Sequence, residues 1–280
     1  MLQDQHKTEN KRLIRSFGRI KSRKLSNHKN AILQNIYPKY QLNSAVFFDA
    51  NFINNFEKTI LEIGFGYGDF LYKMAKDNPQ NLYIGCEPHL NGIINILRKL
   101  EQEPLPNILL LNDDFRKLAP ELNPSLNPSL DQGLNTQKTQ QSSSQTPQAQ
   151  SRLDEKSFFD QIFILFPDPW PKLKHYKRRL INQNFLDEII YPLLKTAKPK
   201  INAKIEQNSA NKDPQIIIAT DHDDYKTWIL SNILKSHKFH WPAKLQKDWQ
   251  EFPQNWLTTK YQEKAANEGR TSIIIKLCSN

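Results

Sequence analysis

A proline-rich loop carries the clearest chemical pattern in this chain. After an apolar run the sequence reads FPDPWPK, from Phe166 to Lys172. Because proline fixes φ and has no N–H, the prolines beside Asp168 predict a stiff loop that holds this carboxylate at the end of a strand. The indole of Trp170 offers a flat face for stacking on a base. The loop therefore predicts a site that binds a base; a rigid turn with a packed tryptophan is the alternative.

A dense run of positive charge follows this loop directly. The run KLKHYKRRL contains Lys172, Lys174, His175, Lys177, Arg178 and Arg179 around Tyr176. Cations interleaved with an aromatic side chain suit a phosphate backbone, so we expect the lysines and arginines to bind phosphates. A solvated approach to a helix is the alternative. Because no carboxylate motif accompanies His175, we do not assign it as a base.

A second pattern is a glycine-rich turn after an apolar strand. The run ILEIGFGYGDF contains Gly64, Gly66 and Gly68. Glycine suits such a turn because it permits positive φ and lets the backbone approach a ligand closely. Nicotinamide and flavin enzymes use a related turn, so the glycines alone do not choose the cofactor. Glu62, two residues before the first glycine, would repel a pyrophosphate but could bind the ammonium group of a methionine moiety.

Acidic residues also stand at the ends of the next two expected strands. Glu87 ends LYIGCEPH, about 20 residues beyond the glycines, where an acidic residue holds ribose hydroxyls. Asp113 follows the third strand and could accept a hydrogen bond from an adenine amino group. Together with Glu62 they suit cationic S-adenosylmethionine (SAM) better than an anionic dinucleotide. Ordinary exposed charges at strand ends are the alternative.

The elements that must position these residues alternate between strands and helices. The expected strands are Thr59–Gly64, Leu82–Glu87, Asn107–Leu111, Gln161–Phe166, Gln215–Thr220 and Thr271–Leu277. The expected helices are Asn27–Tyr37, Gly68–Asn78, Leu90–Glu103, Asn182–Lys195 and Asp223–His237. This alternation predicts an α/β fold with a mainly parallel sheet, whose ligands lie at the carboxyl ends of the strands. Asp221, in ATDHDDY, should lie at the same edge as Asp168; an N-cap of the next helix is an equal alternative.

Three polar or charged segments set the domain organisation. Two of them, at about 120–156 and 200–213, interrupt the alternation, and we expect them to be disordered insertions because they cannot bury enough apolar surface. The first forty residues contain ten lysines and arginines against Asp4 and Glu9. Such a block is typical of an arm that binds nucleic acid, with a solvated tail as the alternative. We therefore predict a basic arm at residues 1–40 and one domain at residues 41–280.

Whole-chain properties limit the class of protein. The net charge of +10 indicates attraction to polyanions. The two cysteines, Cys86 and Cys278, build neither a metal site nor a disulfide framework, which fits a reducing cytosol. Residues 1–12 lack the apolar region of a secretory signal, and no apolar run approaches the roughly 20 residues of a membrane helix. We predict a cytoplasmic protein that binds neither a metal nor a membrane.

These patterns together resemble the bacterial single-chain tRNA (guanine-N7-)-methyltransferases. The matching stretches are RLIRSFGRIKSR, LEIGFGYGDF, IGCEPH, FPDPWPKLKHYKRRL with the following NFL, ATD, and TKYQEK. They occur in the expected order and span most of the chain outside the two insertions. The most specific of them is FPDPWPK with the trailing H-x-KRRL.

The resemblance implies a class I SAM-dependent methyltransferase fold, with one antiparallel terminal strand and helices on both faces of the sheet. It implies methyl transfer from SAM to N7 of a guanine in the tRNA variable loop, at position 46. It assigns SAM binding to Glu62, Glu87 and Asp113, with Asp168 at the active site and beside the methyl donor. It assigns tRNA or guanine contacts to Lys172, Asp221, Thr259, Lys260, Tyr261 and Gln262. The expected partner is tRNA, with no obligate protein partner, and the chain is expected to be a monomer or a homodimer.

The chain departs from the family pattern at two of these positions. Gln262 stands where glutamate is usual, with Glu263 adjacent, and Asp114 stands where a small apolar residue is commoner.

Three other functions stay open at this point. They are a nicotinamide oxidoreductase, a catalytically silent tRNA-binding protein, and a methyltransferase for another RNA atom.

Overall fold

A computed structural model describes residues 25–43, 49–122, 158–194, 215–253 and 256–280 of the chain. The first 24 residues of the predicted arm, the second predicted insertion and nearly all of the first lie outside these ranges. Within the described residues, no helix is both long and apolar enough to cross a membrane.

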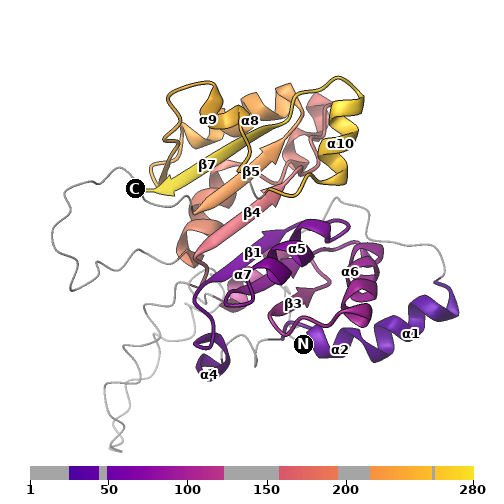
Figure 1. Cartoon of the computed structure of the whole chain (residues 1–280). Helices are drawn as coiled ribbons and strands as arrows, with labels where there is room; N and C mark the ends of the chain where they lie inside the picture. Colours follow the sequence, from indigo (N-terminus) through magenta and orange to yellow (C-terminus); the bar gives the residue numbers. More distant parts are fainter. Residues whose placement is uncertain (1–24, 44–48, 123–157, 195–214, 254–255) are drawn as a thin grey trace, which may run out of the picture.

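The described strands form one seven-stranded sheet in the order β3-β2-β1-β4-β5-β7-β6 (Figure 1). Their bounds are β1 Thr59–Ile63, β2 Leu82–Cys86, β3 Ile108–Leu111, β4 Gln161–Leu165, β5 Ile216–Thr220, β6 Phe239–His240 and β7 Ile273–Ser279. The first five run parallel, whereas β7 is antiparallel to both β5 and β6. Because β2 and β4 flank β1 on opposite sides, the strand order switches at β1, the place where ligands of such sheets bind.

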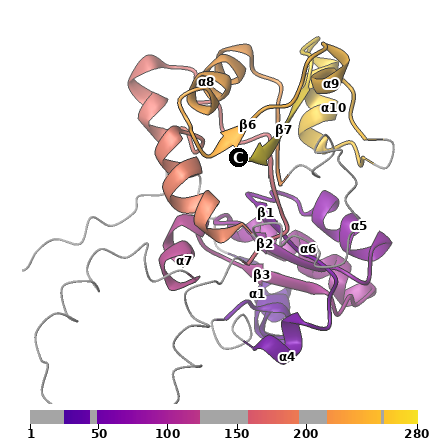
Figure 2. The same cartoon turned by 90° about the vertical axis from the view of Figure 1, so that its left-hand side faces the viewer.

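Helices cover both faces of this sheet, as Figure 2 shows from the side. The described helices are α1 Asn27–Asn35, α2 Tyr37–Tyr40, α4 Ala50–Ile53, α5 Asp69–Asp77, α6 Leu90–Gln102, α7 Phe115–Leu122, α8 Asp223–Ile233, α9 Lys247–Gln250 and α10 Lys260–Asn267. Shorter helical segments lie at Leu173–Arg178, Phe185–Ile190 and Tyr191–Leu193, and the last two are directly joined. In Figure 2, α7 and α8 lie on one side of the sheet, and α5 and α6 lie on the other.

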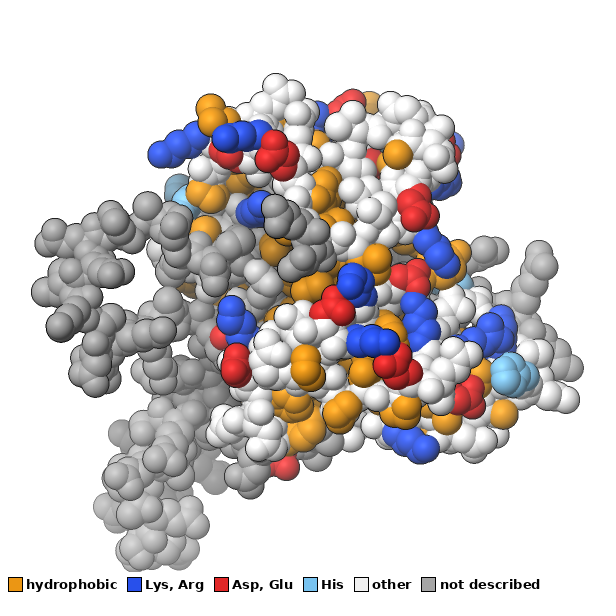
Figure 3. All heavy atoms as spheres, in the orientation of Figure 1, with side chains coloured by type: hydrophobic (Ala, Val, Ile, Leu, Met, Phe, Trp, Pro, Cys, Tyr) orange, Lys and Arg blue, Asp and Glu red, His pale blue; other side chains and the backbone are white. Residues whose placement is uncertain are grey.

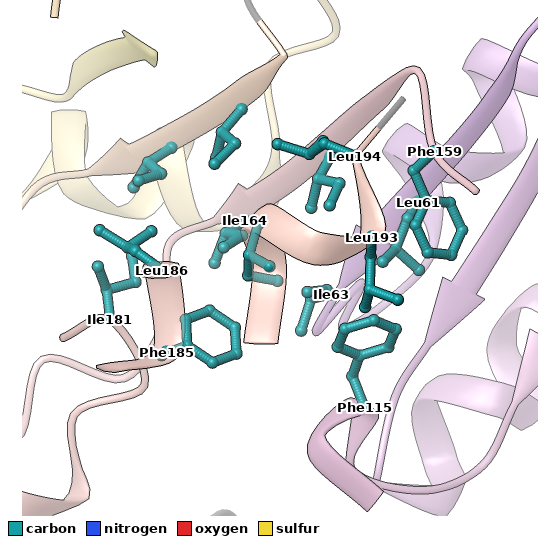
Figure 4. Packing of buried hydrophobic residues seen from close by; sticks show 14 of the residues in the cluster. Leu61, Ile63, Phe115, Phe159, Ile164, Ile181, Phe185, Leu186, Leu193 and Leu194 are labelled. Atoms are coloured by element: carbon teal, nitrogen blue, oxygen red, sulfur yellow. The ribbon is translucent and has the colours of Figure 1, made fainter. Parts of the chain in front are cut away.

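Successive residues of each strand pack into different cores, because side chains alternate across a pleated strand. Leu61 of β1 and Ile164 of β4 belong to the core shown in Figure 4, together with Phe115 of α7. Ile60 and Phe163, one position earlier in the same two strands, belong to the opposite core, which includes residues of α5 and α6. Burial on both faces explains why these strands read as continuous apolar runs.

The predicted elements are confirmed in their order, with differences in extent and type. Helix α7 was not expected, and it continues through Pro120 to Leu122, so the first predicted insertion begins too early. Helix α8 ends at Ile233, four residues before the predicted end at His237. The helix expected at residues 182–195 is confirmed over residues 183–193, where one continuous helical segment passes from a π-helix at Phe185–Ile190 into a tighter turn at Tyr191–Leu193.

Helix α10 was also not expected. It begins after Thr259, whose hydroxyl accepts a hydrogen bond from the main-chain N–H of Gln262 (3.2 Å). This contact caps the helix, because it satisfies one of the main-chain donors left free in the first turn.

Candidate active site

A cavity of about 510 Å³ opens at the carboxyl ends of β1, β2, β3 and β4. It is lined by Gly64 and Gly66 after β1, Glu87 after β2, Asp113 after β3 and Asp168 after β4. The fold therefore brings together most of the predicted cofactor residues at the switch in strand order. Glu62 and Gly68 line a smaller neighbouring cavity, which shares Gly64 with the larger one.

The glycine turn adopts a backbone conformation that other residues rarely take. Gly64, Gly66 and Gly68 have φ values of 77°, 58° and 74°. Gly92 of α6 packs against this turn, and a Cβ atom on it would lie 2.3 Å from the carbonyl oxygen of Gly66 and 2.7 Å from Cγ of Glu87. The cavity thus depends on Gly92, which the sequence analysis did not identify. A glycine inside a helix was the available signal, because it costs about 1 kcal/mol relative to alanine and usually has a packing reason.

Glu87 is held in one orientation by two main-chain groups. The N–H of His89 donates to Oε1 (2.8 Å), and the N–H of Gly66 donates to Oε2 (2.9 Å). Burial raises the pKa of Glu87 above its usual value, and these two hydrogen bonds offset only part of that rise. Each carboxylate oxygen keeps a lone pair that can accept from a ligand hydroxyl.

Glu62 is buried, and its Oε2 has no hydrogen-bond partner among the described residues. Burial, and then the charge of Glu87, raise the pKa of Glu62 to about 8. A buried carboxyl oxygen without a partner is costly and is typical of a site that binds a polar ligand. This oxygen is therefore a candidate partner for a cationic group.

The adjacent aspartates after β3 have different surroundings. Asp113 is about half exposed, and its Oδ1 accepts from the main-chain N–H of Asp114 (2.7 Å) and from Nζ of Lys117 (2.7 Å). Asp114 is buried and is bound by Arg116, whose Nη2 lies 2.7 Å from Oδ2. Asp114 and Arg116 thus form an ion pair in the cavity wall.

The loop around Asp168 is strained on both sides. Phe166 and Trp170 have φ values of 53° and 42°, and each precedes a proline. Side chains other than glycine rarely adopt this region, and such strain is concentrated at functional sites. Burial raises the pKa of Asp168. The guanidinium of Arg178 lies 4.9 Å from the centre of the Trp170 ring.

One predicted phosphate contact is wrong. Arg179 is almost completely buried: its Nε donates to the carbonyl oxygen of Pro169 (2.8 Å), and its guanidinium lies 3.6 Å over the Tyr176 ring. It also pairs with Asp224. Arg179 therefore supports the loop from inside, whereas Lys172, Lys174 and Lys177 are exposed.

The predicted substrate residues near the C-terminus have several roles. Of the run Thr259–Gln262, Tyr261 lines the large cavity and stacks with Phe166 at 6.5 Å, while Thr259 and Lys260 line the small one. Gln262 accepts a hydrogen bond from the indole N–H of Trp256 (3.0 Å). Asp221 does not line the large cavity and pairs with Arg270. The N-cap of α8 is His222, so the alternative role for Asp221 as that cap is wrong.

Charged side chains of both signs are interspersed on the described part of the face in Figure 3. The first forty residues, with ten lysines and arginines against two acidic residues, account for most of the net charge of +10. The attraction to polyanions therefore depends strongly on this N-terminal region.

Comparison with known proteins agrees with this geometry. A model of a family described as putative methyltransferases matches residues 57–127 and 149–275. The chain is 33% identical over 261 residues to the tRNA (guanine-N(7)-)-methyltransferase of Bartonella quintana, covering 91% of each chain. It is 31% identical over 260 residues to that of Bartonella henselae, again covering 91% of each.

A solved structure described as an antibiotic-related methyltransferase covers 86% of this chain and 96% of its own, with 18% identity and a TM-score of 0.48. The strand order and the antiparallel β7 are those of a class I methyltransferase sheet. From its sequence similarity, the chain belongs to the tRNA (guanine-N(7)-)-methyltransferase family.

Proposed function

We propose that this chain transfers a methyl group from SAM to N7 of a guanine in tRNA, at position 46 of the variable loop. The observation that carries the proposal is the cavity in which Glu87 and Asp113 meet Asp168. The relatives that match over 91% of the chain are named for this reaction.

The residues at the cavity fit SAM. Oε2 of Glu62, which has no hydrogen-bond partner in the described part of the chain, would accept from the ammonium of its methionine moiety. Glu87 would accept from the ribose hydroxyls, and Asp113 from the adenine amino group. The positive φ values of Gly64 and Gly66 let the main chain approach the ligand closely. When bound, SAM supplies an electrophilic methyl group on its sulfonium.

The task left to the protein is alignment. Guanine N7 has an in-plane lone pair, so no proton must be removed before it attacks, and placing the reacting atoms in line is the main contribution. Asp168 would orient the guanine by accepting from its N1–H or its N2 amino group. Trp170 and Tyr261, which both line the cavity, offer flat faces to the base. Asp221, which pairs with Arg270 and does not line this cavity, would contact the tRNA beyond the guanine.

The remaining predicted residues would bind the rest of the tRNA. Exposed Lys172, Lys174 and Lys177 and the basic arm at residues 1–40 would contact phosphates. Thr259–Gln262 would lie against the guanine or its neighbours. We propose that the chain acts in the cytoplasm, as a monomer or homodimer and without an obligate protein partner.

Single-turnover transfer from labelled SAM to unmodified tRNA tests this function, with 7-methylguanosine mapped by borohydride–aniline cleavage. Cleavage at the variable-loop guanine is expected. Methyl incorporation without that cleavage would contradict the choice of N7. Binding of SAM and tRNA without any incorporation would favour a silent tRNA-binding protein, and binding of a nicotinamide cofactor in place of SAM would favour an oxidoreductase.

A further inference from the structure

The two N-terminal helices reach the edge of the cavity. The hydroxyl oxygen of Tyr37, the first residue of α2, accepts a hydrogen bond from the main-chain N–H of Asn112 (3.0 Å). Asn112 directly precedes Asp113, which lines the cavity. Tyr37 therefore fixes the main chain beside a proposed adenine-binding carboxylate.

Asn112 extends this connection to the neighbouring strand. Its Nδ2 donates to the carbonyl oxygens of Glu87 (2.9 Å) and Pro88 (3.3 Å). A continuous set of hydrogen bonds thus joins Tyr37 to the chain segments that carry both Asp113 and Glu87. Losing Tyr37's hydroxyl would loosen the end of β3 relative to the end of β2.

Two further contacts hold the N-terminal segment in place. Nζ of Lys29 in α1 donates to Oδ1 of Asn91 (3.0 Å), a residue that lines the cavity. The main-chain N–H of Leu42 donates to the carbonyl oxygen of Leu110 in β3 (2.8 Å). The position of Tyr37 is therefore set by contacts on both sides of it in the chain.

We propose that Tyr37 is a positioning residue for the methyl donor, acting through Asn112 on Glu87 and Asp113. The proposal rests on the proposed function, because it assumes that these two carboxylates hold SAM. It makes α1 and α2 part of the cofactor-binding unit, in addition to any contact with RNA. If the loss of this bond is transmitted in full to the cofactor site, its ordinary strength corresponds to about a fivefold change in affinity for SAM.

Tyr40 offers a matched control on the same helix. Tyr40 is more deeply buried than Tyr37; burial raises its pKa, and a hydrogen bond with the main chain of Leu105, three residues before β3 begins, partly offsets that rise. The hydroxyl of Tyr40 therefore lies near the opposite end of β3. Tyr37→Phe and Tyr40→Phe therefore each remove a hydroxyl oxygen from the same helix. The first change lies beside the cavity, and the second lies away from it.

The test uses the full chain and measures SAM binding by calorimetry together with steady-state kinetics. For Tyr37→Phe we expect the Kd and KM for SAM to rise about fivefold, while kcat at saturating SAM and KM for tRNA are unchanged. For Tyr40→Phe we expect an unchanged KM for SAM even where the thermal midpoint falls. An unchanged KM for SAM in Tyr37→Phe, or an equal rise in both variants, would overturn the proposal. A wild-type chain that binds no SAM would overturn the proposed function itself.

Discussion

Nε of Arg179 donates a hydrogen bond to the carbonyl oxygen of Pro169, the residue directly after Asp168. The same guanidinium pairs with Asp224 and lies over the ring of Tyr176. One buried cation thus connects the strained loop to α8 and to the turn that follows the loop. The position of Asp168 depends on a residue that does not reach the substrate.

Replacing Arg179 by lysine tests this support. Lysine keeps the charge but lacks the planar fork that bonds two partners while stacking on a ring, so we expect Arg179→Lys to lower the single-turnover rate at least about tenfold. SAM affinity should stay unchanged. The control Lys177→Ala, in the same segment but exposed, should alter only tRNA binding. A normal rate with weakened tRNA binding in Arg179→Lys would instead indicate a phosphate contact.

Removing the carboxylate of Asp168 should separate chemistry from cofactor binding. We expect Asp168→Ala to lower the methylation rate about 100-fold or more, because the guanine loses its orienting acceptor, and to bind SAM nearly as the wild type does. Burial raises the pKa of Asp168, so the wild-type rate should fall as the pH decreases through that raised pKa and the acceptor is protonated. A pH–rate profile under single-turnover conditions measures both effects. Loss of SAM binding in Asp168→Ala would place this residue in the cofactor site.

Glu62 should release a proton when SAM binds. Its pKa of about 8 keeps the carboxyl mostly protonated at pH 7, and an ammonium group beside it would lower that pKa. We therefore expect close to one proton to be released per SAM at pH 7, and less as the pH rises above 8. Calorimetry in buffers of different ionisation enthalpy measures this number. Glu62→Gln should release none, whereas the exposed control Glu57→Gln should behave like the wild type; equal release by Glu62→Gln would assign the proton elsewhere.

The parts that could be predicted from sequence are those that local pattern determines. Buried strands such as β1 read as apolar runs, and the glycines and Glu87 follow directly from the turns at their ends. Arg179 could not be assigned, because an arginine in a basic run looks the same whether it meets phosphate or lies over Tyr176. That distinction depends on residues of α8, which come more than forty positions later in the chain.

Helix α10 shows a different limit. Its sequence, KYQEKAAN, buries only Ala265, so it has no apolar stripe that would predict a helix. It is held by tertiary contacts, including the stacking of Tyr261 on Phe166. The pairing of Asp221 with Arg270 joins residues 49 positions apart in the chain, so only the folded chain shows it.

The exposed lysines after the loop should set the salt dependence of tRNA binding. Each phosphate contact that is lost lowers the slope of log affinity against log salt by about 0.7–0.9, so the triple variant of Lys172, Lys174 and Lys177 to alanine should lower it by roughly 2–3. Filter binding of tRNA over a range of salt concentrations measures the slope. The control Lys76→Ala removes an exposed lysine that is paired with Glu103, and it should leave the slope unchanged. An unchanged slope in the triple variant would place the phosphate contacts elsewhere, and the basic residues 1–40 would then be the first region to test, because they hold most of the net charge.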